Sequence, residues 1–274
     1  MTNKLKHSDF ILIHKYSLRL MASFPFLFIF LASGEALQHT YESFLGMFNG
    51  LEQFRHFQND PARLSFGALK AFILLSALLT IPRVLFHFDK GYSALWLDKK
   101  ALRKLINLFA YLLVLTVIGL VGVGIAFVVI EYFEKENIHS LFVVVFLMPF
   151  FIGSAYYEKF IAKDFGILWN AKNIPNLESS KSKGRTMSFY QVLLMGITAA
   201  PLIVFHLQLN KLAIGNTFFS PLILTFDSFL IAYLSITMGV ATWLAYCRVY
   251  SDGLLLNDSY AKSTQPPKKI SDLT

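Results

Sequence analysis

Residues 224–247 read LTFDSFLIAYLSITMGVATWLAYC, an almost wholly apolar run that carries one carboxylate, Asp227. A membrane-spanning helix needs about 20 consecutive, mainly apolar residues, and this run is long enough. Because backbone polar groups must be satisfied internally in lipid, such runs are expected to be helices. Six runs of this kind are predicted as spans, and they cover residues 20–37, 66–88, 107–130, 140–157, 187–207 and 221–247. The predicted fold class is therefore an all-α integral membrane protein, a bundle of six transmembrane helices.

The composition supports this class. The chain has 274 residues, of which 55% are hydrophobic and only 15% are charged, whereas soluble domains carry about 25% charged residues. We expect a single transmembrane domain over residues 1–250 and a short flexible tail over residues 251–274. The single cysteine, Cys247, excludes an intramolecular disulfide and a cysteine metal cluster.

The basic residues predict an orientation. They are concentrated in four segments, residues 1–19, 83–104, 158–186 and 248–274. The other segments carry few, namely Arg55, Arg63, Lys70, Lys135 and Lys211. This alternation places both termini in the cytoplasm by the positive-inside rule. The basic segments then face the anionic inner leaflet of a lipid bilayer. This placement accounts for the net charge of +8, so nucleic acid is not expected as a partner. The short loops favour a bacterial inner membrane.

The first span has a competing interpretation. Its apolar core, residues 20–34, is short, and the following ASGEA at 32–36 faintly resembles a signal-peptidase site. The segment before the core is long for a signal peptide, so we expect an uncleaved span. Cleavage of this segment stays an open alternative.

Two loops are predicted to contain short interfacial helices. In the first outer loop Tyr41, Phe44, Phe48 and Leu51 recur at three- and four-residue steps, which indicates one apolar helical face. In the second cytoplasmic loop KFIAKDFGILWNAK mixes aromatic residues with lysines, and the following NIPNLESSKSKGR is expected to be a flexible basic linker.

No catalytic motif is present in the sequence. It contains no HExxH pair for zinc and no GxxxxGK[ST] loop for phosphates. None of its seven histidines falls in the middle of a predicted span, which disfavours a transmembrane haem. We therefore expect no enzyme activity, no catalytic residue, no cofactor and no metal centre.

Small residues predict two helix-packing faces. Gly119, Gly122 and Ala126 share one side of the third span, and Ser235 and Gly239 form a similar pair in the sixth. Small residues let helix backbones approach closely in lipid. These faces are expected either to join spans within the bundle or to contact another subunit or membrane protein.

Asp227 is the leading candidate for a functional residue. If the last helix starts at Ser220–Pro221, Asp227 lies about 9 Å along its axis, where a carboxylate is costly unless it is paired or hydrated. It would then bind a substrate or ion, or form a structural ion pair. His206 is the expected partner and Lys70 the second. Alternatively, the helix begins at Asp227 itself, which then caps it at the outer surface.

Pro201 is a further candidate for the substrate or ion site. It interrupts the fifth span and frees a carbonyl near Ile197, and freed carbonyls can coordinate ions in transporters.

Three functions are compatible with these features. The first is a small permease or the membrane subunit of a transport or export system. The second is a non-catalytic interaction protein, such as an assembly factor, a regulator or an immunity-type protein, that binds another membrane protein or a second copy of itself. The third is a lipid-acting membrane enzyme.

Overall fold

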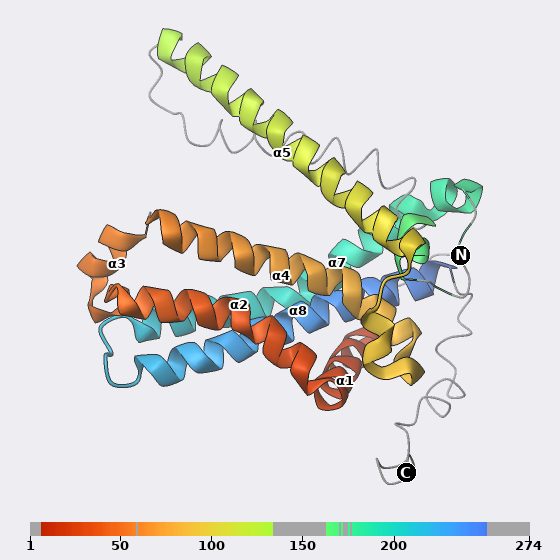
Figure 1. Cartoon of the computed structure of the whole chain (residues 1–274), viewed down its shortest axis with the longest axis horizontal. Coiled ribbons are helices and arrows are strands. Elements are labelled where there is room, and N and C mark those ends of the chain that lie inside the picture. Colours follow the sequence, from red (N-terminus) through yellow and green to blue (C-terminus); the bar gives the residue numbers. More distant parts are fainter. Residues whose placement is uncertain are drawn as a thin grey trace. The chain divides into compact units, whose positions relative to one another are not determined.

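The computed structural model describes residues 7–58, 60–133, 163–169, 171, 175 and 177–250. Every regular element in these ranges is a helix, which confirms the all-α class (Figure 1). The helices are α1 (His7–Ser23), α2 (Pro25–Phe44), η1 (Met47–Asn49), α3 (Leu51–Phe57), α4 (Pro61–Phe86), η2 (Phe88–Leu95), α5 (Lys99–Phe133), α7 (Leu177–Ala213) and α8 (Ser220–Tyr250).

The chain forms two compact units. The first contains the chain up to Trp96 and again from Phe189 onward, and it holds α1 to α4, most of α7, and α8. The second covers Leu97–Ser188 and contains α5, which begins directly after Asp98; the Asp98 carboxylate accepts a hydrogen bond from the backbone of Ala101. The single domain expected over residues 1–250 stays a prediction.

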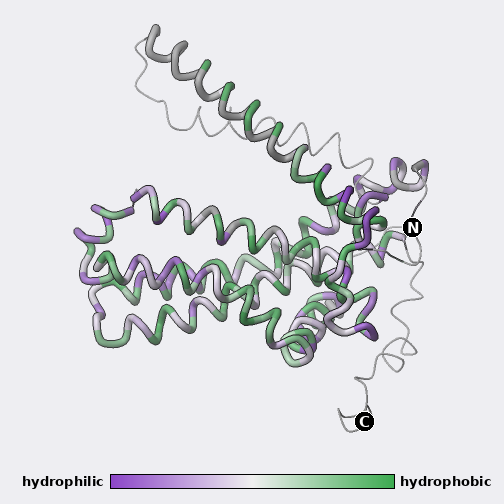
Figure 2. Tube along the Cα trace, viewed as in Figure 1, coloured by the Kyte–Doolittle hydropathy of each residue, from purple (hydrophilic) through white to green (hydrophobic). Residues whose placement is uncertain are grey.

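Within the described residues, α4, α7 and α8 are each long and apolar enough to cross a membrane. The number of such spans rises to four if α1 and α2 together make one bent span. Figure 2 shows hydrophobic residues along these helices, with hydrophilic residues along α2 and at α3. These helices indicate a membrane protein, while the number six and the cytoplasmic termini stay predictions.

Three predicted spans lie within observed helices, 107–130 in α5, 187–207 in α7 and 221–247 in α8. The predicted span 66–88 falls mainly in α4, which begins five residues earlier and ends at Phe86. Residues 140–157 and the tail 251–274 lie outside the described part of the chain.

The first predicted span is not one helix. The chain breaks between Ser23 and Pro25, where α1 and α2 meet at an angle of 101°. Phe24 has φ −131° and ψ 60°, because a residue that precedes proline is disfavoured in the helical conformation. The prediction of a single helix over residues 20–37 is therefore wrong. The break lets α2 continue to Phe44 as a separate helix within the bundle.

The loop helices also differ from expectation. Tyr41 and Phe44 belong to α2, whereas Phe48 lies in η1 and Leu51 in α3, so the four do not share one helix. Gly46 ends the first segment with φ +71°, a conformation that glycine adopts readily. In the second cytoplasmic loop residues 163–168 are helical, and the sequence predicted as a flexible linker is helical from Leu177 onward.

Helix α8 is the centre of the first unit. It packs against α1, α2 and α4, and it is buried on most of its circumference. A Cβ built on Gly239 would lie 2.5 Å from the Cβ of Ile81 on α4. Gly239 therefore joins α8 to α4 within the bundle, beside the buried Ser235. The predicted face of Gly119, Gly122 and Ala126 lies in α5. The surroundings of Gly119 and Ala126 fall outside the described part, so the role of this face stays a prediction.

We expect Gly239→Ala to destabilise the protein by about 1–3 kcal/mol, because the added methyl group overpacks the contact with Ile81. The measurement is the midpoint of thermal unfolding of the purified protein in detergent. Gly196→Ala in α7 is the matched control, since a Cβ there meets no atom within 4 Å. Its midpoint should be unchanged or slightly higher, because alanine favours helices over glycine. Equal midpoints for both variants would contradict the close packing.

Candidate functional site

Asp227 is buried inside the bundle. Helix α8 begins at Ser220, so the carboxylate lies about 10 Å along the helix from its start. Its exposed fraction is 0%. The alternative in which Asp227 caps the helix at the outer surface is thus wrong, because α8 starts two turns earlier.

The neighbours of Asp227 on α7 are His206 and Asn210. His206 Nδ1 lies 2.8 Å from each carboxylate oxygen of Asp227. Asn210 Nδ2 donates to Asp227 Oδ2 at 2.9 Å. The structure therefore brings His206 to Asp227, as the hairpin of the last two spans predicts. Whether the pair binds a substrate or ion stays a prediction at this point.

Helix α2 supplies a polar face that sequence reasoning missed. Four buried polar residues recur on it at positions i, i+3, i+4 and i+7, namely Glu35, Gln38, His39 and Glu42. This spacing places them on one side of α2. Helix α2 packs against α8 and α4. Gly34 permits the close approach to α4, since a Cβ there would lie 2.9 Å from Ile73 Cδ1.

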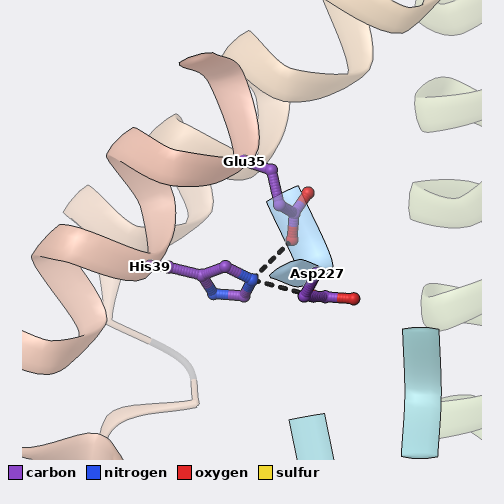
Figure 3. A group of neighbouring side chains, drawn as sticks. All are labelled: Glu35, His39 and Asp227. Atoms are coloured by element: carbon purple, nitrogen blue, oxygen red, sulfur yellow. Dashed lines mark hydrogen bonds and ion pairs between the residues drawn. The ribbon is translucent and has the colours of Figure 1, made fainter. Parts of the chain in front are cut away.

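His39 lies at the centre of this cluster, between the carboxylates of Glu35 and Asp227 (Figure 3) and beside that of Glu42. Its Nε2 is 2.9 Å from Asp227 Oδ2 and 3.1 Å from Glu35 Oε1. Its Nδ1 is 3.0 Å from Glu42 Oε2. Both ring nitrogens thus face carboxylate oxygens, which accept but do not donate when ionised. A proton on each nitrogen, or another cation beside Nε2, satisfies this arrangement.

Two cations from α4 lie at the edges of the cluster. Lys70 Nζ is 3.0 Å from Glu35 Oε2, and Arg63 Nε is 2.7 Å from Glu42 Oε1. The Lys70 and Arg63 side chains are 22% and 21% exposed, whereas the carboxylates of Glu35 and Glu42 are almost fully buried. The expectation of Lys70 as an alternative partner of Asp227 is therefore wrong, because Lys70 pairs with Glu35.

The cluster carries balanced charge only with a further positive group. Its three carboxylates face two permanent cations, Arg63 and Lys70. One negative charge remains, and an imidazolium at His39 or a bound cation compensates it. Isolated buried charge is costly in a bundle of apolar helices, so the cluster requires one positive group beyond Arg63 and Lys70.

Pro201 is not part of the cluster. It lies within α7 on an exposed face, and α7 continues through it. The hydroxyl of Thr198, three residues before Pro201, donates to the backbone carbonyl of Leu194 in the same helix. Pro201 thus does not join Asp227 and His206 in the structure.

The missed residues had a readable signal. Glu35 lies in the ASGEA segment that resembled a cleavage site, and His39 lies just beyond the predicted end of the first span. The periodic polar face of α2 follows an apolar run without a break. A polar stripe of this kind, continuing an apolar helix, predicts a helix whose polar side faces protein rather than lipid.

Comparisons with protein-family models, with curated proteins and with solved structures found no match for this chain.

Proposed function

We propose that the protein is a membrane transport component, a small permease or the membrane subunit of a transport system, and that the cluster around His39 is its cation-binding site. The carrying observation is a histidine held between three buried carboxylates, in a bundle whose helices α4, α7 and α8 are long and apolar enough to cross a membrane. Ionisable residues in membrane helices mark ion pathways and binding sites by default.

Stability alone does not account for the cluster. Burying an ion pair costs desolvation that its Coulomb attraction often fails to recover, and apolar residues of similar volume are commonly as stable or more stable. Here five charged side chains and two histidines meet in one place, from the four helices α2, α4, α7 and α8. Such an arrangement supports a binding role.

The cluster suits a small cation better than a large ligand. The carboxylates of Asp227 and Glu35 are 0% and 1% exposed, so the donor oxygens are enclosed by protein. A lipid headgroup needs a wider opening, which disfavours the lipid-acting enzyme. The alternative function, an interaction protein, depends on small-residue helix faces that are free to bind a partner. Gly239 in one of these faces already packs against Ile81, which disfavours that function.

Within this proposal we place the protein in a bacterial inner membrane with cytoplasmic termini. The cluster lies near the end of the bundle where α7 and α8 are joined, which is the outer side in that orientation (Figure 1). Lys70 and His206, whose side chains are 22% and 17% exposed, line its edges. A cation from outside would therefore meet the cluster soon after it enters the bundle.

We expect proteoliposomes that contain only this protein to conduct a cation, and Asp227→Asn to lower the flux by about tenfold or more. Entrapped dyes report protons, sodium, potassium and zinc in separate experiments. Glu52→Gln is the control, since Glu52 is exposed on α3 and should leave the flux unchanged. If the preparation contains no stoichiometric partner and the protein conducts none of these ions, the permease proposal is refuted. A stoichiometric partner would indicate the subunit form, and the flux is then measured with the complex.

A further inference from the structure

We propose that Glu35, His39 and Asp227 form a binding site for a divalent transition-metal cation of the zinc class. This inference rests on the proposed function, because it names the cation that the same site takes.

The donor atoms already converge. One oxygen of Glu35, Nε2 of His39 and one oxygen of Asp227 all lie within 4.8 Å of one another. The two distances from Nε2 to these oxygens are 3.1 and 2.9 Å. Donors around a tetrahedral zinc ion with bonds of about 2.0 Å lie about 3.3 Å apart. The two oxygens therefore need to move away from Nε2 by only a few tenths of an ångström to reach the spacing of zinc ligands.

Histidine 39 is oriented as a metal ligand would be. Metal-binding histidines almost always donate their other ring N–H to a carboxylate or carbonyl, which fixes the tautomer. Here Nδ1 donates to Glu42 Oε2 at 3.0 Å, so Nε2 is the nitrogen that faces Glu35 and Asp227 (Figure 3). Nε2 holds a proton toward these carboxylates when no ion is bound, and a metal ion would take the place of that proton. Glu42 is itself held by Gln38 Nε2 at 2.8 Å and Arg63 Nε at 2.7 Å. These contacts hold the imidazole ring in place from the side opposite to the proposed ion.

The other two donors are held in the same way. His206 and Asn210 from α7 hydrogen-bond to Asp227, and Lys70 from α4 contacts both oxygens of Glu35. Each proposed ligand thus has a partner on its far side. Groups that support metal ligands in this manner raise ligand basicity and restrict ligand motion.

Donor type selects the class of cation. With Arg63 and Lys70 counted, the three carboxylates leave one negative charge when His39 is neutral, and this charge attracts a cation. One imidazole nitrogen with two carboxylate oxygens suits zinc, manganese or ferrous iron. Calcium and magnesium prefer oxygen ligands alone, and copper(I) prefers sulfur. Three protein donors leave one coordination position of a tetrahedral ion open. A transport site must also release its ion, and an open position permits this.

The test is zinc binding by the purified full-length protein in detergent. Equilibrium dialysis with Zn²⁺ at fixed pH should give one saturable ion per chain. Glu35→Gln, His39→Gln and Asp227→Asn should each weaken binding at least tenfold, and Glu42→Gln by about 10–100-fold. Glu52→Gln, on the exposed side of α3, should bind as the wild type does. Elution volume in size-exclusion chromatography confirms that each variant is folded.

A second measurement does not depend on variants. X-ray absorption of the bound zinc should show one imidazole and oxygen donors, at about 2.0–2.2 Å. The inference is overturned by the absence of saturable binding, by binding that survives both Asp227→Asn and His39→Gln, or by a spectrum without imidazole. Cation flux that needs Asp227 but involves no zinc would overturn the metal site and leave the transport proposal standing. Zinc binding without flux of any ion would overturn the transport proposal and leave the metal site standing.

Discussion

Replacing His39 with leucine is expected to destabilise the protein by about 3–5 kcal/mol, the largest loss for a single substitution in the cluster. His39 contacts Glu35, Glu42 and Asp227 within 3.1 Å. Leucine removes all three contacts and leaves the carboxylates facing an apolar side chain. Their mutual repulsion then acts in a region of low dielectric constant, where it is poorly screened.

The measurement is the unfolding free energy from denaturant titration in mixed micelles. His56→Leu is the matched control, because His56 is exposed on the short helix α3. We expect His56→Leu to change the unfolding free energy by no more than about 0.5 kcal/mol. Triple replacement of Glu35, Glu42 and Asp227 by their amides in the His39→Leu background should recover part of the loss. A stable His39→Leu variant would show that the three carboxylates do not depend on the imidazole.

The parts of the fold that were predictable depend on local sequence. Long apolar runs predict the helices α5, α7 and α8 because the hydrocarbon core sets a minimum helix length. The proline after Phe24 is visible in the sequence, but the sequence does not predict that it breaks the helix, since membrane helices often tolerate proline within a span. The break at Phe24 decides where α2 lies, and with it the position of the whole polar face.

The candidate site was predictable only in part, for a related reason. Asp227 stands out as an acid in an apolar run, and the hairpin of α7 and α8 predicts His206 beside it. The contact of Asp227 with His39 joins residues 188 positions apart. It depends on how α2 packs against α8, which no local pattern specifies. The same packing pairs Lys70 with Glu35 rather than with Asp227.

Lys70→Met is expected to destabilise the protein by about 3 kcal/mol, because Glu35 loses the cation that lies 3.0 Å from its carboxylate. Methionine keeps most of the apolar stem, so the change isolates the charge. The measurement is again the unfolding free energy in mixed micelles. Lys211→Met, at an exposed position of α7, controls for the loss of a lysine and should be nearly neutral.

The double variant decides whether the loss at Lys70 is electrostatic. In Lys70→Met with Glu35→Gln the side chain at position 35 is neutral, so no buried carboxylate is left without its cation. We expect the double variant to recover at least half of the loss, which is the coupling that a direct ion pair predicts. Equal stability of the double and single variants would mean that Lys70 acts through packing against α2, where the Cα of Lys70 lies 3.5 Å from a Cβ built on Gly34. Recovery would show instead that Lys70 stabilises the bundle chiefly by neutralising the buried carboxylate of Glu35.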